Sequence, residues 1–166
     1  TYIGNGMPDW TFGLNFSAGW KNLDFYMLWQ STVGNDVLDV TRRTDISESN
    51  MPSYMLGRWT GEGTSNKYPR LVRGDNVNWQ MSDLYVQDGS YLRLKNIQLG
   101  YTLPQKWTKH VLISSLRIYV AAENLLTFTS YRGYDPEISS GGTSLGVDYG
   151  VYPQPRTFLC GLNLKF

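Results

Sequence analysis

The sequence has very few of the residues from which catalytic and metal sites are usually built. Its 166 residues include one histidine, His110, and one cysteine, Cys160. A lone cysteine cannot form an internal disulfide, and one histidine with one cysteine is too few for a typical transition-metal site. Nothing in the chain supplies a nucleophile beside a base. We therefore expect no enzymatic activity, no cofactor and no metal ion.

An excess of charge and long apolar runs are also missing. The formal net charge is +1, which provides no basic field for nucleic acid, so no nucleic-acid partner is expected. No run reaches the roughly 18 apolar residues that a membrane-spanning helix needs. Residues Thr1 to Gly4 lack the charged start of a signal peptide, and no apolar centre follows. We therefore expect a mature, truncated or partial chain.

What the chain does have is amphipathic strands rich in aromatic residues. Residues 156–166 alternate between an apolar face, which ends on Phe166, and a mainly polar face. Because successive side chains of a strand point to opposite sides, this pattern predicts a strand. An amphipathic strand that ends the chain on an aromatic residue indicates a β-barrel closed in an outer membrane.

A second strand with aromatic ends is expected at 10–20. Trp10 and Trp20 bracket its apolar face. Ten residues at ~3.3 Å each, tilted by roughly 40°, give about 25 Å of height, which matches an outer-membrane apolar band. Aromatic rings prefer the two edges of such a band. We therefore assign Trp10, Trp20, Phe128 and Phe158 to membrane girdles.

The other strands are expected at 23–33, 90–103 and 116–128. The apolar parity of the 90–103 strand switches near Lys95-Asn96, which predicts either a β-bulge or a strand that leaves the membrane above this point. Short or moderate connections alternate with two long loops, about 33–89 and 129–155, as in outer-membrane barrels. Five strands cannot close such a barrel, because the smallest use eight. The sequence therefore predicts an all-β fold: antiparallel strands of a larger transmembrane barrel, with long extracellular loops.

Several stretches of the chain also carry a family resemblance. The longest is Ser82 to Pro104, and the others are Gly34 to Asp36, Ala122 to Leu125, Gly133 to Glu137 and Pro153 to Thr157. They resemble the C-terminal end of the SusC/RagA family of TonB-dependent outer-membrane transporters of Bacteroidetes. The resemblance implies a barrel of the 22-stranded, plugged type. Residues 1–166 would be its C-terminal part, without the plug domain and the TonB box.

The resemblance further implies a function and partners. Family members import glycan fragments, or peptides in some cases, across the bacterial outer membrane. The TonB complex supplies the energy through the N-terminal region, and a SusD-like surface lipoprotein covers the pore. Gly161, Leu164 and Phe166 resemble the signal that the barrel-assembly machinery recognises, and outer-membrane lipid would surround the barrel.

Candidate contact residues lie in the loops and on the inner wall. Four external aromatic residues could stack on sugar rings or pack against the lipoprotein: Trp59, Trp79, Tyr131 and Tyr134. The alternative is that these rings fold the long loops on themselves. Arg117 and Glu123 are expected to face the lumen, either as a polar path or as a pair within the wall.

Two other functions fit the same residues. A soluble β-sandwich that binds carbohydrate would use the same alternation and the same aromatic residues. A TonB-dependent siderophore receptor would use a different lid system.

Overall fold

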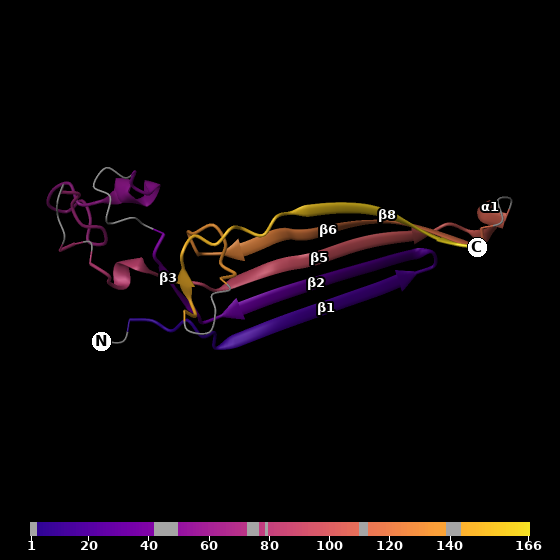
Figure 1. Cartoon of the computed structure of the whole chain (residues 1–166), viewed down its shortest axis with the longest axis horizontal. Helices are drawn as coiled ribbons and strands as arrows, with labels where there is room; N and C mark the ends of the chain where they lie inside the picture. Colours follow the sequence, from indigo (N-terminus) through magenta and orange to yellow (C-terminus); the bar gives the residue numbers. More distant parts are fainter. Residues whose placement is uncertain (1–2, 42–49, 73–76, 79, 110–112, 139–143) are drawn as a thin grey trace.

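Five long strands form one open antiparallel sheet, and the long loops gather at one end of it (Figure 1). The structure is a computed structural model that describes residues 3–41, 50–72, 77–78, 80–109, 113–138 and 144–166. The sheet has the order β1-β2-β5-β6-β8. Its strands are β1 (Trp10–Trp20), β2 (Leu23–Val33), β5 (Tyr91–Thr102), β6 (Ser115–Thr129) and β8 (Thr157–Lys165). The expected strands are thus confirmed to within one residue at each end.

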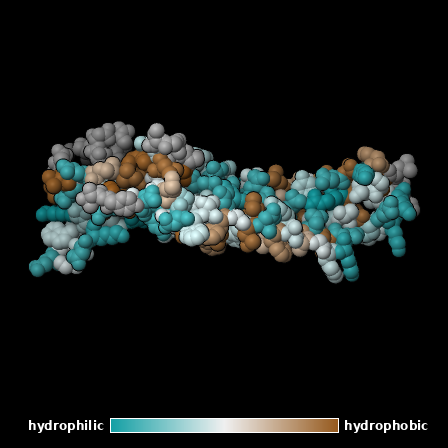
Figure 2. Space-filling model, turned by 90° about the horizontal axis from the view of Figure 1, so that it is seen from below, coloured by the Kyte–Doolittle hydropathy of each residue, from teal (hydrophilic) through white to brown (hydrophobic). Residues whose placement is uncertain are grey.

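One face of this sheet is apolar across all five strands. The register places Ala18, Phe25, Leu99, Val120 and Cys160 in one row, and Phe16, Met27, Ile97, Ala122 and Phe158 in the next. Large apolar side chains on this face stay exposed, with Leu14 60% and Leu162 64% accessible. Figure 2 views the molecule from below and shows hydrophobic surface interspersed with hydrophilic surface along the sheet. A soluble sheet would bury such a face.

The predicted β-bulge is present and keeps the apolar face continuous. The register shifts between Leu94 and Asn96, so that Lys95 is the extra residue of β5 relative to β2. Leu94 and Ile97 therefore lie on the same face although their parity differs. On β6 the matching irregularity is at Asn124, which has a positive φ of 51° and donates a hydrogen bond to the Pro155 carbonyl at 3.1 Å.

Short and long connections lie at opposite ends of the sheet. Lys21, with φ 53°, and Asn22 form the two-residue turn between β1 and β2. The short helix α1 (Gln105–Thr108) and the C-terminus lie towards the same end in Figure 1. The loops that follow β2 and β6 both lie at the other end, as the alternation of loop lengths predicted.

The two long connections contain more regular structure than expected. A second sheet of order β4-β3-β7 joins them through β3 (Asp36–Asp39), β4 (Val86–Asp88) and β7 (Val147–Asp148). Two short 3₁₀ helices, η1 (Ser53–Gly57) and η2 (Asp83–Tyr85), lie between β3 and β4. Sequence analysis missed β3, β4 and β7 because strands of two to four residues carry too little alternation to be recognised.

The most buried side chains of the described residues lie mainly among these loops. Val37, Met55 and Asp148 are at most 2% accessible. The small sheet lies beyond the end of the large one (Figure 1) and does not pack face to face with it, as a sandwich requires. Within the described residues, no helix has the length and apolarity needed to cross a membrane.

Substitution of Leu162 tests which face of the large sheet contacts lipid. In a full-length protein carrying this segment, Leu162→Arg should reduce the yield of folded barrel, because arginine on the lipid face costs up to about 2–4 kcal/mol. Leu159→Arg is the matched control, since Leu159 lies on the opposite face of β8 in the row of Ala121 and Gln98. The heat-modifiable band on electrophoresis measures folded barrel. Equal yields from the two variants would contradict the assigned orientation.

Candidate functional site

An ion pair crosses the polar face of the large sheet, which lies opposite the apolar face and is called the inner face below. Asp24 on β2 accepts hydrogen bonds from the Arg117 guanidinium on β6, one of them at 2.9 Å from Nε. Strand β5 lies between these strands, and the pair passes over Gly100. A Cβ at Gly100 would lie 2.5 Å from Arg117 Nη2 and from both carboxylate oxygens of Asp24. Glycine is therefore required here for the two side chains to meet.

The expected inner-wall residues do not pair with each other. Arg117 pairs with Asp24, while Glu123 lies in the register row of Asn96 and Thr157. Arg117 and Glu123 lie six residues apart on β6, which is about 20 Å and too far for an ion pair. Both side chains belong to the polar face of the strand. Among the described residues, Glu123 has no ion-pair partner.

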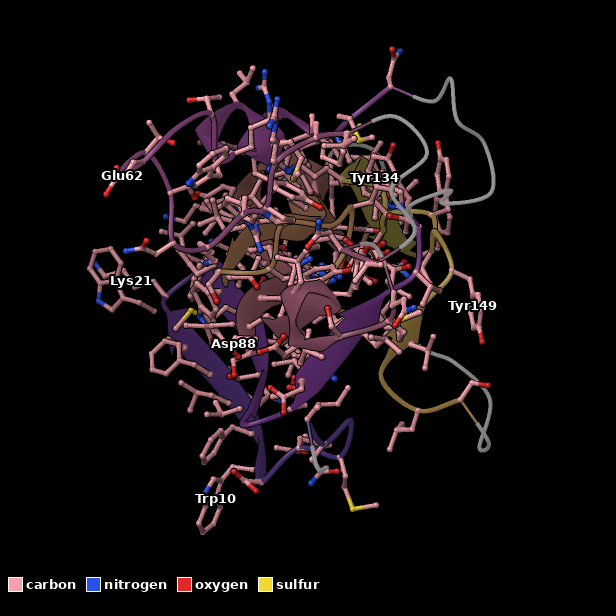
Figure 3. All side chains as sticks on the ribbon, turned by 90° about the vertical axis from the view of Figure 1, so that its left-hand side faces the viewer. Trp10, Lys21, Glu62, Asp88, Tyr134 and Tyr149 are labelled. Carbon is pink, nitrogen blue, oxygen red and sulfur yellow. The ribbon has the colours of Figure 1, made fainter. Side chains whose placement is uncertain are left out.

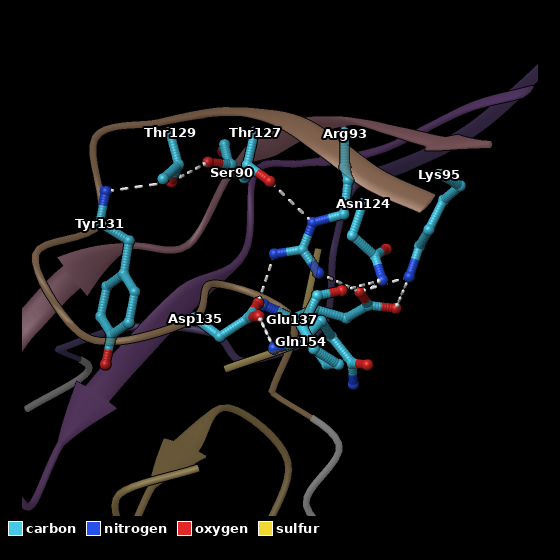
Figure 4. A network of polar contacts seen from close by, with 11 residues as sticks. Ser90, Arg93, Lys95, Asn124, Thr127, Thr129, Tyr131, Asp135, Glu137 and Gln154 are labelled. Carbon is cyan, nitrogen blue, oxygen red and sulfur yellow. Dashed lines mark hydrogen bonds and ion pairs between the residues drawn. The ribbon is translucent and has the colours of Figure 1, made fainter. Parts of the chain in front are cut away.

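A buried ionic network anchors the second long loop to the inner side of β5 (Figure 4). Arg93 and Asp135 are each 3% accessible and pair at 2.6 Å, and Arg93 also contacts Glu137 at 2.7 Å. Lys95 pairs with Glu137 at 2.6 Å. Thr127 on β6 accepts a further hydrogen bond from Arg93 Nε at 2.9 Å. Buried charges are tolerated only with such complete pairing, so the loop is held in one position.

Asp135 is the centre of this anchor because it joins both limbs of the loop. Its carboxylate accepts hydrogen bonds from the backbone amides of Glu137 at 2.9 Å and Gln154 at 2.8 Å. Burial alone would raise the pKa of Asp135. The hydrogen bonds from Arg93, Gln154 and Glu137, together with the charge of Arg93, outweigh burial and hold the pKa below its ordinary value of 3.8.

Tyr131 lies inside the loop cluster rather than on its surface. Its side chain is 6% accessible, and its hydroxyl donates to the carboxylate of Asp148, which also accepts from the amides of Gly150 and Val151. Burial and the neighbouring Asp148 raise the pKa of Tyr131 well above its ordinary value. The expectation that Tyr131 offers a stacking face to cargo needs correction, because packing of the loops occupies its ring and hydroxyl.

Two open clefts lie in the loop cluster, on either side of Arg132. The first, of about 640 Å³, contains Trp59 and Tyr68. The second, of about 810 Å³, is lined by Tyr54, Tyr134 and Tyr149. Figure 3 shows Tyr134 and Tyr149 on the same side of the cluster, and Tyr134 is 76% accessible.

The four aromatic residues that were expected to contact cargo or lipoprotein therefore have different surroundings in the structure. Trp59 and Tyr134 each line a cleft, and Tyr131 is buried. Trp79, like His110, lies outside the described residues. Sequence reasoning missed Tyr54, Tyr68 and Arg132, since nothing in their local pattern marks them as cleft residues.

The residues expected at membrane edges lie on or beside the apolar face. Trp10 and Trp20 end β1 and are 65% and 67% accessible. Phe128 stacks on Trp29 with ring centroids 6.4 Å apart. Phe158 is the first apolar-face residue of β8. Their contact with a membrane edge stays a prediction.

The three residues expected to form an assembly signal have different surroundings. Gly161 lies beneath the Tyr119 ring, where a Cβ would come within 2.4 Å of a ring carbon. Leu164 pairs in register with Leu116, and Phe166 follows the last strand and is 84% accessible. Gly161 thus has a packing role in addition to the predicted signal.

Among the described residues, no group of three or more His, Cys, Asp or Glu side chains is placed to hold a metal ion. The polar clusters that do occur are ion pairs, hydrogen-bond networks and clefts, which hold loops and offer surfaces for binding.

Comparisons with known proteins agree with a barrel segment. No protein-family model matches the chain. It is 38% identical to TonB-dependent receptor P3 of Formosa agariphila over 99% of its own length, and 30% identical to TonB-dependent receptor SusC of Bacteroides thetaiotaomicron over 95%. It spans only 17% and 15% of the lengths of those curated relatives.

Solved structures give the same result. The match to a structure of the RagAB peptide importer in the closed-closed state covers 99% of this chain and 18% of the importer chain. Its TM-score is 0.79, and the sequences are 27% identical. The open-open state matches 96% of the chain with a TM-score of 0.76 and 28% identity, over 17% of that chain. The sheet is thus a portion of an outer-membrane β-barrel. The curated relatives are TonB-dependent receptors, SusC among them, and the matched solved structures are those of a peptide importer.

Substitution of Gly100 tests the ion pair on the inner face. In the full-length protein, Gly100→Ala should lower the free energy of unfolding by about 1–3 kcal/mol, because the added methyl group displaces Arg117 and Asp24. Gly13→Ala is the control, since an added Cβ at Gly13 meets nothing within 4 Å. Urea titration of the full-length protein refolded into bilayers measures the difference. Equal stabilities of the two variants would contradict the role of Gly100.

The docking of the second long loop should depend on pH. A carboxyl whose pKa is lowered by folding stabilises the folded state above its ordinary pKa, and this contribution is lost as the pH falls through the folded pKa. Loop docking by Asp135 should therefore be complete at neutral pH and weaken below about pH 3.8. Hydrogen exchange of residues 131–138, corrected for intrinsic rates, measures it. Asp135→Asn should abolish the dependence, and its persistence in that variant would contradict this assignment.

Proposed function

We propose that the chain is the C-terminal segment of a SusC-like barrel that imports oligomeric nutrients across the bacterial outer membrane. The observation that carries the proposal is the match of nearly the whole chain, sheet and loops together, to a TonB-dependent receptor at 38% identity and to the RagAB peptide importer at a TM-score of 0.79. The cargo is a glycan fragment or a peptide.

The two faces of the large sheet support this proposal. The apolar face has exposed rows of side chains suited to outer-membrane lipid, while the inner face has the Asp24–Arg117 pair and the loop anchor around Arg93. A barrel that contains an aqueous path requires this division between its faces.

The proposed partners follow from the same assignment. A SusD-like surface lipoprotein would cover the loop end of the barrel, where the clefts of Trp59 and Tyr134 lie. The TonB complex would act through the plug region outside residues 1–166. The barrel-assembly machinery would read Gly161, Leu164 and Phe166 in the last strand. A siderophore receptor with a different lid is the alternative, and co-purification with a SusD-like lipoprotein distinguishes the two.

Uptake measurements test the function of the whole receptor. A strain that lacks the gene should lose growth on one class of oligomer, either glycan or peptide. The wild-type gene should restore growth only when the TonB complex is intact. Unchanged growth of the deletion strain on all oligosaccharides and peptides tried would contradict import by this receptor.

Substitutions in the clefts test the contact residues. Trp59→Ala and Tyr134→Ala should each lower uptake or lipoprotein binding by about 3- to 10-fold, because an aromatic contact is worth roughly 0.5–1.5 kcal/mol. Tyr152→Ala is the control, since Tyr152 is 85% accessible and lines neither cleft. Binding and uptake by the full-length receptor give the readout. If Trp59→Ala and Tyr134→Ala show the same binding and uptake as Tyr152→Ala, the two rings contact neither cargo nor lipoprotein and only pack within the loops.

A further inference from the structure

The cleft of Trp59 contains three cations that form no ion pair with any described carboxylate. These are Lys67, Arg70 and Arg132, which together line the cleft with a single acidic residue, Asp83. None of the three has an ion-pair partner among the described residues. In contrast, Arg93, Lys95 and Arg117 are all ion-paired. The positive charge of this cleft is therefore a local property of the loop cluster, in a chain whose net charge is only +1.

Aromatic rings hold these cations in place without cancelling their charge. The Arg132 guanidinium lies 4.7 Å from the centre of the Tyr54 ring, Lys67 Nζ lies 5.6 Å from that of Tyr68, and the Arg70 guanidinium lies 6.0 Å from that of Trp59. Cation–π contacts orient a cation and leave its hydrogen-bond donors available. Arg132 uses some of its donors on Gln87 and on the Tyr68 hydroxyl. Among the described residues, the side chains of Lys67 and Arg70 donate no hydrogen bond, although the Lys67 backbone amide donates one to Ser65.

The rest of the lining is polar and suits a sugar. Ser65, Asn66 and Asn78 line the cleft together with Trp59 and Tyr68. Rings beside hydroxyl and amide groups match a saccharide, which has an apolar ring face and an edge of hydroxyls. A volume of about 640 Å³ is within the usual range for small-molecule sites.

We propose that this cleft binds the anionic group of an acidic oligosaccharide, either a carboxylate or a sulfate ester. Lys67 and Arg70 contact the anion, while Trp59 and the neighbouring amides contact the sugar that bears it. The inference names the cargo class of the proposed import function and rests on it. Because the cleft is open to solvent, the binding depends on ionic strength.

Binding to the full-length receptor in detergent tests the proposal with matched probes. Oligogalacturonate is compared with its methyl ester, and a sulfated galactan oligosaccharide with its desulfated form. Hexaglutamate is the acidic peptide. At least one acidic sugar should bind at least about 10-fold more tightly than its neutral counterpart, and added salt should reduce that difference. The pair that shows the difference identifies carboxylate or sulfate as the anion.

Variants assign the binding to this cleft. The double variant Lys67→Gln/Arg70→Gln should bind the acidic sugar about 5- to 10-fold more weakly than the wild type, and its affinity for the neutral counterpart should be unchanged. Arg156→Gln is the control, because Arg156 is exposed and does not line the cleft. Arg132 is kept, since its hydrogen bonds to Gln87 and Tyr68 also hold the loops together.

Several outcomes would overturn the inference. These are equal affinity for charged and neutral sugars, no binding of any acidic sugar, an unchanged affinity in the double variant, and preferential binding of hexaglutamate. If the receptor takes up a neutral cargo in a TonB-dependent manner, and the double variant takes it up equally well, the anionic cleft is refuted and the import function stands. Tight binding of an acidic sugar without any uptake would refute import and leave the cleft standing.

Discussion

The β-bulge at Lys95 is the feature on which both halves of this structure depend. A shift of one residue exchanges the two faces of a strand. Without the extra residue Lys95, the apolar side chains either before or after the bulge in β5 would therefore point to the inner face of the sheet. With it, Leu94 and Ile97 share the apolar face. The side chains of Arg93 and Lys95 reach the same loop on the inner side, where they pair with Glu137.

This anchor explains why the loop cluster has a defined shape at the end of an open sheet. Asp135 joins Arg93 to the backbone of both limbs of the second loop, and β7 from that loop pairs with β3 from the first. The two loops therefore support each other. Their shared interior holds Val37, Tyr131 and Asp148, and this leaves the clefts between the loops in fixed positions.

Sequence reasoning predicted the large sheet well and the loops poorly. The strands and the bulge follow from period-2 alternation, which is strong over nine to fifteen residues. The short strands of the loops have no such signal. Tyr131 and Tyr134 lie three residues apart and looked equivalent, yet one is 6% and the other 76% accessible. The hydroxyl of Tyr131 donates a hydrogen bond to Asp148, which lies seventeen residues further along the chain, and no local pattern reveals this contact.

The sequence alone determined that this chain forms amphipathic strands of a transmembrane barrel, because the alternation of side chains between two faces is a local property of the backbone. The tertiary structure decided which charges are neutralised and which are not. Arg93, Arg117 and Arg132 look alike in the sequence. Folding brings Asp135 to the first and Asp24 to the second, but aromatic and polar side chains to the third. Electrostatic pairing depends on distances between residues far apart in the chain, and only the folded sheet and its docked loops set those distances.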